Sequence, residues 1–222
     1  MTDATPASFR DVLREIPTRP TEQPQLLAAD VPADPLRLLR TWLEEEAERD
    51  TPVAHGFLLA TVSPDGVPEG RTVILKDLDE AVWFATPSTS AKGRALAATP
   101  VAEAVFWWAT SGRQLRLRGA VEPAPREVSE ADFRARHPKA RAGVIIGRQG
   151  TERDDPAEVD RLYDEALASI DENPDQVPEA WTAYRLVPDR VDVVQLRPAS
   201  DGERVQYSRT DGGDWTVRDL WP

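Results

Sequence analysis

The chain has 222 residues, of which 40% are hydrophobic and seven are Trp, and it carries a formal net charge of −12. This length and apolar content predict one sizeable folded domain, while the acidic excess argues against nucleic acid or an anionic membrane as a partner. The chain has no Cys and only two His, which excludes disulfides, thiolate catalysis and Cys-ligated metals, so we expect no metal site.

Residues 1–33 contain five Pro and little periodicity, which predicts a flexible N-terminal arm with one short helix near Phe9 to Ile16. This segment lacks the composition of a signal or transit peptide. No run in the chain approaches the roughly 18–20 apolar residues that span a membrane. We therefore expect no membrane partner and a cytoplasmic location, with residues 34–222 forming a single domain.

Regular structure is expected to begin at Asp34, a good N-cap residue, which is followed by Pro35 at the first helical position. Apolar residues then recur at helical spacing, at Leu36, Leu39, Trp42 and Leu43. This pattern predicts an amphipathic helix that ends near Arg49.

From Gly56 to Val121 the sequence changes to short runs typical of strands, namely GFLLATV, GRTVILK, AVWFAT, AEAVFWWA and RQLRLRGAVE. A short helix is expected to interrupt them, capped by Ser88 or Ser90 and closed by Pro100. Closely spaced strands with peripheral helices predict a mainly β, α+β fold built as an antiparallel barrel.

Two more helices and two more strands are expected in the second half of the chain. The run SEADFRAR has a capping-box-like Ser129 and Asp132, and DPAEVDRLYDEALASI has apolar residues along one side. The runs AYRLVPDRVDVVQL and RVQYSR predict the final strands, which lead to WTVRDLWP.

Common catalytic and nucleotide-binding motifs are absent. His55 and His137 are expected at the surface or in packing, and the FWW run at 106–108 in the core. What remains is a set of cations beside apolar strands, which consists of Arg71, Lys76, Lys92, Arg94, Arg113 and Arg116.

Two of these cations suggest a phosphate site. Lys92 lies in the first turn of the short helix, where free backbone N–H groups and the helix dipole favour an anion, and Arg71 could supply a bidentate contact. Strict alternation would send Arg71 and Lys76 to opposite faces, so they should perform different tasks or meet different subunits. On spacing alone, ordinary strand-end cations that reach water explain the set equally well.

Several motifs follow one another along the chain: RTVILK, FATPSTSAKG, VFWWATSGRQLRLRGAVE, ADFRARHP, GRQG, VPEAW and a closing W…RDLWP. This order resembles the pyridoxamine 5′-phosphate oxidase family of flavoproteins from about Asp34 to Pro222. The resemblance implies a split β-barrel homodimer that binds FMN at each end of the subunit interface.

The resemblance also assigns residues. Arg71, Ser90 and Lys92 would hold the FMN phosphate, and the backbone of residues 73–75 would line the flavin ring. The full set of positions that it assigns to FMN is Arg71, Thr72, Val73, Ile74, Leu75, Lys76, Ala85, Thr86, Ser90, Ala91, Lys92, Gln114, Gln149, Gly150 and Arg204. Four positions depart from the family pattern, with Ala91 for Arg, Ala85 for Tyr, Val194 for Trp and Gly150 for Ser.

Departures are stronger on the substrate side. Members that oxidise vitamin B6 phosphates hold the phosphate with Lys, Tyr, Arg and Ser, and the ring with a C-terminal R-x-H motif. Lys76 and Arg136 match, but Asp132 replaces the Tyr and Ala140 the Ser, while Ser200 and Gly202 stand where Arg and His are expected. Each lost charge-assisted hydrogen bond typically removes about 1.5 to 3 kcal/mol. We expect Lys76, Asp132 and Arg136 at a substrate site that B6 phosphates fit poorly.

The resulting hypothesis is an FMN-dependent oxidoreductase that transfers a hydride from a small anionic substrate to flavin N5, with reoxidation by O2. Lys76 and Arg136 suggest an anionic or carboxylate-bearing substrate, as in the related flavin oxidases that finish phenazine biosynthesis. Three alternatives stay open: a true pyridoxine/pyridoxamine 5′-phosphate oxidase with an altered pocket, a flavin-binding protein without turnover, and a split barrel that uses a deazaflavin or haem.

Overall fold

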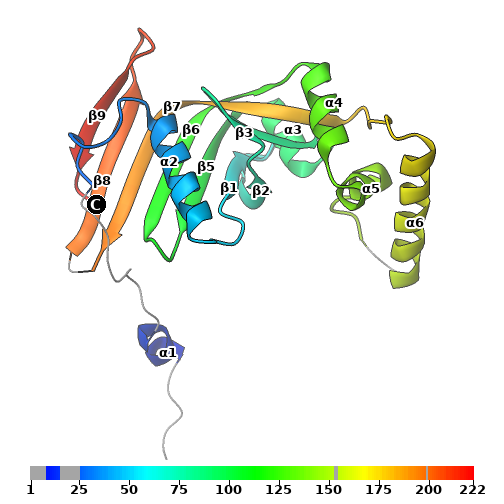
Figure 1. The fold of residues 1–222 in the computed structure, drawn as a ribbon, viewed down its shortest axis with the longest axis horizontal. Coiled ribbons are helices and arrows are strands. Elements are labelled where there is room, and N and C mark those ends of the chain that lie inside the picture. Colours follow the sequence, from blue (N-terminus) through cyan, green and yellow to red (C-terminus); the bar gives the residue numbers. More distant parts are fainter. Residues whose placement is uncertain (1–8, 16–25, 153–154, 199) are drawn as a thin grey trace, which may run out of the picture.

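The computed structural model describes residues 9–15, 26–152, 155–198 and 200–222, and within them one 9-stranded antiparallel sheet is flanked by helices (Figure 1). The strands are β1 (Gly56–Val62), β2 (Pro68–Ile74), β3 (Asp77–Leu78), β4 (Val82–Pro87), β5 (Val101–Trp108), β6 (Arg113–Pro123), β7 (Trp181–Arg197), β8 (Ser200–Arg209) and β9 (Trp215–Leu220). They run in the order β2-β1-β5-β6-β7-β4-β3, and β8 and β9 continue from β7. The predicted antiparallel, β-rich α+β fold is confirmed, whereas barrel closure and a homodimer stay predictions.

The 17-residue strand β7 organises the sheet. Residues 181–186 pair with β4, residues 190–197 pair with β8, and β6 accompanies both parts. The register between β6 and β7 shifts after Arg118, where a Cβ on Gly119 would lie only 1.9 Å from the Val187 carbonyl oxygen. A glycine is therefore needed where this strand pair changes register.

The helices are α1 (Phe9–Glu15), α2 (Pro35–Glu48), α3 (Ala91–Ala98), α4 (Arg126–Ala135), α5 (Pro138–Ile146) and α6 (Pro156–Glu172). Asp34 caps α2 as predicted, and of the two predicted caps of α3, Ser88 and Ser90, it is Ser90 that caps the helix. Helices α4, α5 and α6 gather at one end of the sheet, where β7 starts (Figure 1). Residues of this helical group line one side of a cavity beside the sheet.

The prediction that Ser129 begins a helix is wrong. Helix α4 begins at Arg126, and Ser129 lies inside it. Its hydroxyl accepts a hydrogen bond from the backbone N–H of Ala183 at 3.0 Å, a residue on β7. Ser129 therefore ties the helix to the sheet, a contact between residues 54 positions apart that no local pattern reveals.

The core lies between α2 and the sheet. Trp42 of α2 meets Trp108 edge to face, with ring centroids 6.2 Å apart, and Phe57 packs on both Phe84 and Phe106. Of the FWW run, Phe106 and Trp108 are buried as predicted, but Trp107 is 47% exposed. Alternation along β5 places Trp107 on the opposite face of the sheet.

The N-terminal segment is described only in part. Helix α1 confirms the predicted short helix, while residues 1–8 and 16–25, on which the predicted flexibility also falls, lie outside the described residues. Residues 26–33 contact the C-terminal strands: Leu26 donates its N–H to Glu203, and the Tyr207 hydroxyl donates to the Pro32 carbonyl at 2.9 Å. Among the described helices, none has the length and apolar character needed to cross a membrane.

Candidate functional site

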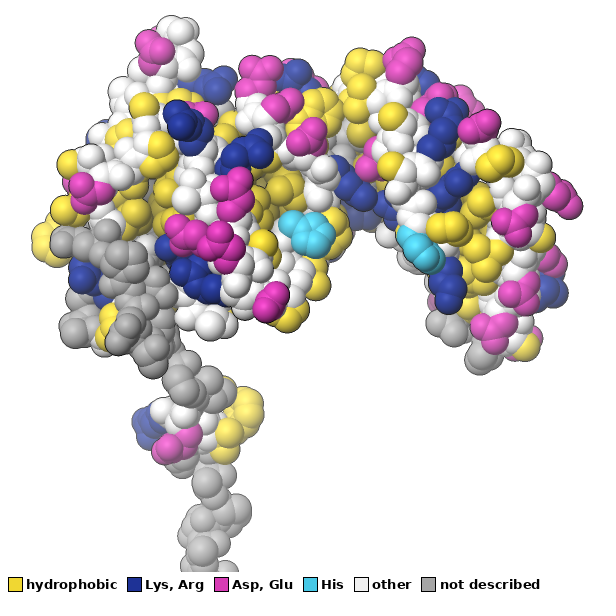
Figure 2. Space-filling model, viewed as in Figure 1, with side chains coloured by type: hydrophobic (Ala, Val, Ile, Leu, Met, Phe, Trp, Pro, Cys, Tyr) yellow, Lys and Arg dark blue, Asp and Glu magenta, His cyan; other side chains and the backbone are white. Residues whose placement is uncertain are grey.

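A cavity of about 1220 Å³ lies between the sheet and the helical group. Its walls come from β2, β4, the start of α3, the link between α4 and α5, and helices α5 and α6. Figure 2 shows a hollow between the sheet body and the helical part, with Lys and Arg side chains at its edge. The volume exceeds the roughly 300–1,000 Å³ of ordinary small-molecule pockets, so the cavity has room for a cofactor together with a substrate.

Arg71 reaches this cavity from β2, an edge strand of the sheet. Its guanidinium donates to Thr61 Oγ1 at 2.6 Å and to Glu69 Oε2 at 2.7 Å. These contacts fix the position of the guanidinium, and the side chain remains 22% exposed. The group is therefore held in place and still accessible to a ligand.

The amino end of α3 lies at the same wall. Ser90 Oγ accepts from the N–H of Gly93 at 3.2 Å and lies 3.2 Å from Thr86 Oγ1, at the end of β4. A Cβ on Gly93 would lie 2.3 Å from the Ser88 carbonyl oxygen, so the chain closes this tightly only around a glycine. The free N–H groups and dipole of a helix start favour an anion here.

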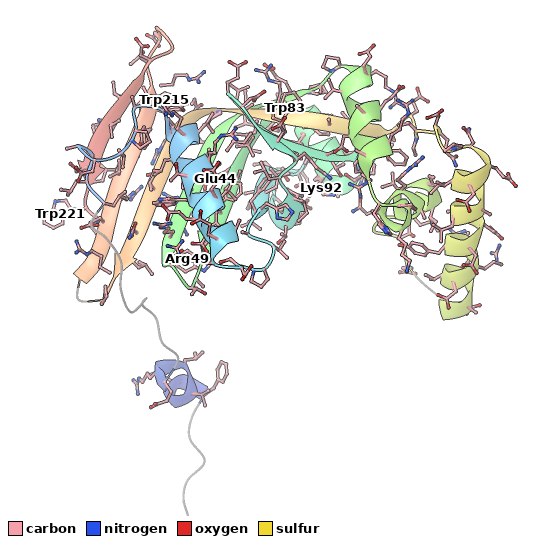
Figure 3. The ribbon with its side chains drawn as sticks, viewed as in Figure 1. Glu44, Arg49, Trp83, Lys92, Trp215 and Trp221 are labelled. Atoms are coloured by element: carbon pink, nitrogen blue, oxygen red, sulfur yellow. The ribbon has the colours of Figure 1, made fainter. Side chains whose placement is uncertain are left out.

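Lys92 adds a second cation beside Arg71. Its ammonium donates to Thr86 Oγ1 at 3.1 Å, and it forms no ion pair within the described part of the chain. Burial and the nearby charge of Arg71 lower the pKa of Lys92. Figure 3 shows Lys92 between the sheet and the helical group. Two neighbouring cations at a helix start are suited to hold a phosphate group.

Lys76 lines the same cavity as Arg71. That the two residues face opposite sides stays a prediction, because the consecutive residues Thr72, Val73 and Ile74 line this cavity as well. Strand β2 ends at Ile74, after which the chain changes partners: Leu75 N–H donates to the His55 carbonyl and Lys76 N–H to the Trp83 carbonyl. The alternation of less and more exposed residues nevertheless continues from Arg71 to Lys76.

A second group of charges surrounds Lys76. Its ammonium lies 3.6 Å from Asp132 Oδ1, and Asp132 Oδ2 accepts a hydrogen bond from Trp181 Nε1 at 2.9 Å. Arg136 stacks on the Trp181 ring, 4.5 Å from its centroid, and its Nε is buried without a hydrogen-bond partner in the described residues. Burial lowers the pKa of Arg136, while the Asp132 charge opposes that effect. Arg136 also lines the cavity, so its guanidinium can meet a ligand anion there.

An apolar wall faces these cations. It consists of Val144, Ile145, Ile146, Val159, Leu162 and Tyr163, from α5 and α6. The sequence predicted the apolar side of α6 but not α5, whose short run has no strong helical periodicity. His137, expected at the surface or in packing, caps α5 by accepting from the Lys139 N–H, and it also lines the cavity.

The structure brings most of the predicted site residues together. Those that line the cavity are Arg71, Thr72, Val73, Ile74, Lys76, Ala85, Thr86, Ser90, Lys92, Arg136 and Gln149. Leu75, Ala91 and Gly150 are chain neighbours of these residues, and Asp132 contacts Lys76 from behind the wall.

Gln114 and Arg204 do not join them. The strand pairing places Gln114 opposite Val194 and Val194 opposite Arg204, in one row across β6, β7 and β8. Arg204 is held by Asp192, with its Nη2 2.7 Å from Oδ1. Although burial raises the pKa of Asp192, hydrogen bonds from Arg190, Arg204 and Gln206 lower it to about 2. This row lies away from the cavity within one chain.

The sequence is similar to that of known proteins. The family model described as pyridoxamine 5′-phosphate oxidase matches residues 43–163. A pyridoxine/pyridoxamine 5′-phosphate oxidase from Ralstonia pickettii (strain 12J) is 36% identical over 195 residues, which cover 87% of this chain and 92% of the relative. One from Nostoc punctiforme (strain ATCC 29133 / PCC 73102) is 32% identical over 194 residues, covering 87% and 91%.

Two solved structures are similar to this chain in fold. PhzG from Burkholderia lata 383, in complex with tetrahydrophenazine-1-carboxylic acid, has a TM-score of 0.83 at 26% identity and covers 93% of this chain and 100% of that one. A pyridoxamine 5′-phosphate oxidase-related, FMN-binding protein from Nostoc punctiforme PCC 73102 has a TM-score of 0.71 at 22% identity, covering 85% and 98%, and shares the fold.

The fold and the cavity define a β-sheet-rich α+β protein with a small-molecule site lined by cations. Together with the family match and relatives more than 30% identical over most of its length, this shows that the chain belongs to the pyridoxamine 5′-phosphate oxidase family.

Proposed function

We propose that this protein is an FMN-dependent oxidoreductase that acts on a small anionic substrate. The observation that carries the proposal is the presence of two separate cationic groups in one cavity, Arg71 with Lys92 and Lys76 with Arg136. One group matches the phosphate of a cofactor and the other an anionic group of a substrate. The likeness to an FMN-binding family member supports the choice of FMN.

Each part of the cavity has a task in this proposal. Arg71, Ser90 and Lys92 would hold the FMN phosphate at the start of α3. When bound, FMN would accept a hydride from a substrate carbon and return the electrons to O2. Lys76 and Arg136 would orient the substrate by its anionic group, and the apolar wall from α5 and α6 would keep water away from its ring.

A carboxylate-bearing substrate is supported by the PhzG structure, whose bound compound is a tetrahydrophenazine carboxylic acid. A second candidate is oxidation of pyridoxine or pyridoxamine 5′-phosphate, which the names of the curated relatives favour. The residues around Lys76 support the first candidate, because a carboxylate, Asp132, already occupies one side of that ammonium.

We further propose that the active form is a homodimer. Gln114 and Arg204 belong to the FMN set by resemblance yet lie away from the cavity of their own chain. The same face of the sheet exposes Leu58 and Trp107, two large apolar side chains. A second copy that covers this face would bury them and could bring its Gln114 and Arg204 to the flavin.

An anaerobic absorbance titration tests the proposed reaction. The FMN-loaded protein is mixed separately with a dihydroaromatic carboxylate and with pyridoxine 5′-phosphate, without oxygen. The proposal predicts that the carboxylate bleaches the flavin absorbance and pyridoxine 5′-phosphate does not. Bleaching by pyridoxine 5′-phosphate would establish the second candidate. A flavin that stays oxidised with both compounds and with reduced nicotinamides would indicate a binding protein without turnover.

A further inference from the structure

We propose that Asp132 determines which anions the substrate site accepts, favouring monoanionic carboxylates over dianionic phosphates. Asp132 would do this by cancelling part of the positive charge of Lys76 and Arg136. This inference rests on the proposed function, since it concerns the substrate end of the same cavity. Asp132 acts as a positioning residue, because it contacts Lys76 and Trp181 and does not line the cavity itself.

Asp132 is held firmly by two partners. Trp181 Nε1 donates to one carboxylate oxygen at 2.9 Å, and the Lys76 ammonium lies 3.6 Å from the other. The side chain is 16% exposed, so water screens this charge less than a surface charge. The carboxylate therefore stays beside Lys76 when a ligand enters.

Lys76, Arg136 and Asp132 together carry a net charge of one positive unit. Lys76 and Arg136 contribute two positive charges to the cavity wall, and Asp132 behind them contributes one negative charge. Arg136 lies one helical turn after Asp132 and stacks on the same indole ring, with its Nε lacking a partner in the described residues. One monoanion thus balances the group, whereas a dianion leaves an excess negative charge close to the Asp132 carboxylate.

The position of Asp132 also sets what Lys76 offers to a ligand. An ammonium has three N–H donors, and the Asp132 carboxylate attracts it toward the back of the wall. A phosphate that needs several donors would compete with Asp132 for this ammonium. A carboxylate needs fewer donors and can be held by the remaining N–H groups of Lys76 together with Arg136.

The inference is tested with two probes of similar shape and different charge, benzoate and phenyl phosphate, at pH 8. Their affinities for the FMN-supplemented protein are measured by calorimetry in the wild type and in Asp132→Asn, whose amide oxygen can still accept from Trp181. Glu130→Gln is the matched control, because Glu130 is on the same helix and pairs with Arg126 and Arg134 away from the cavity. Both variants remove one negative charge.

We expect the wild type to bind benzoate more tightly than phenyl phosphate. Asp132→Asn should raise the phenyl phosphate affinity at least about tenfold and change the benzoate affinity by less than about threefold, while Glu130→Gln changes neither. The inference would be overturned if Asp132→Asn raised the affinities for both probes equally or left the ratio of the two affinities unchanged. It would also be overturned if neither probe bound measurably. The FMN content of each sample, read by absorbance, reports separately on the proposed function.

A wild-type comparison covers the case in which Asp132→Asn does not fold. Methyl phenyl phosphate has the same phosphorus centre as phenyl phosphate but a single negative charge. The wild-type protein should bind this diester at least as tightly as phenyl phosphate. A clear preference for the dianion would refute the role of Asp132.

Discussion

Replacing Asp192 by Asn is expected to destabilise the fold in a pH-dependent manner. The Asp192 carboxylate is 6% exposed and accepts hydrogen bonds from Arg190, Arg204 and Gln206. These contacts outweigh the effect of burial and lower its pKa from 3.8 to about 2. A shift of this size corresponds to about 2 kcal/mol of folding free energy at neutral pH, at 1.36 kcal/mol per pKa unit.

The sign of the pH dependence follows from the lowered pKa. The ionised carboxylate stabilises the folded state above the unfolded value of 3.8, and this contribution is lost as the pH falls through about 2. The difference between the wild type and Asp192→Asn should therefore stay near 2 kcal/mol from pH 7 to 4 and shrink to about half near pH 3.

Chemical denaturation at pH 7, 5, 4 and 3 measures this difference as the free energy of unfolding. Asp189→Asn is the matched control on the same strand. Asp189 pairs with Arg118 at 2.9 Å, but its side chain is 57% exposed, so its removal should cost at most about 1 kcal/mol. The reasoning is refuted if both variants lose the same stability, or if the loss in Asp192→Asn does not depend on pH between 4 and 3.

The remaining predictions concern the phosphate site and the assembly. Gly93→Ala should cost about 1–3 kcal/mol and weaken FMN binding, because its Cβ would meet the Ser88 carbonyl oxygen at 2.3 Å. Gly212→Ala, whose Cβ would meet only Thr210 Oγ1 at an ordinary 3.7 Å, should leave both the melting temperature and FMN affinity nearly unchanged. Light scattering should give twice the 24.6 kDa mass of one chain, and a mass of 24.6 kDa at micromolar concentration would contradict the proposed dimer.

Local signals in the sequence predicted several elements well. Asp34 and Ser90 are N-cap residues that act within one turn of the chain, so the starts of α2 and α3 could be read directly. The predicted helix from DPAEVDRLYDEALASI is confirmed as α6, which Asp155 caps. The apolar runs located β1, β2 and β4 to β8, because alternation is also a local pattern, but they gave no sign of the two-residue strand β3.

Features that depend on distant contacts were not predictable in this way. The role of Ser129 comes from Ala183, and after Ile74 the chain changes strand partners, so that the Lys76 N–H donates to the Trp83 carbonyl. Helix α5 has little periodicity of its own, and Gly143 packs it against Tyr163 of α6. The site residues were gathered mainly by the family resemblance, and only the structure shows that Gln114 and Arg204 lie apart from the rest.

The most direct test of the central claim compares the binding of FMN and riboflavin, which differ by the phosphate group alone. Fluorescence titration of the apoprotein should show FMN binding at least about a hundredfold more tightly than riboflavin, because Arg71, Lys92 and the start of α3 would hold the phosphate. In the Arg71→Ala/Lys92→Ala double variant this difference should largely disappear. Equal affinities for the two flavins in the wild type, or an unchanged preference for FMN in the double variant, would contradict the assignment of this site.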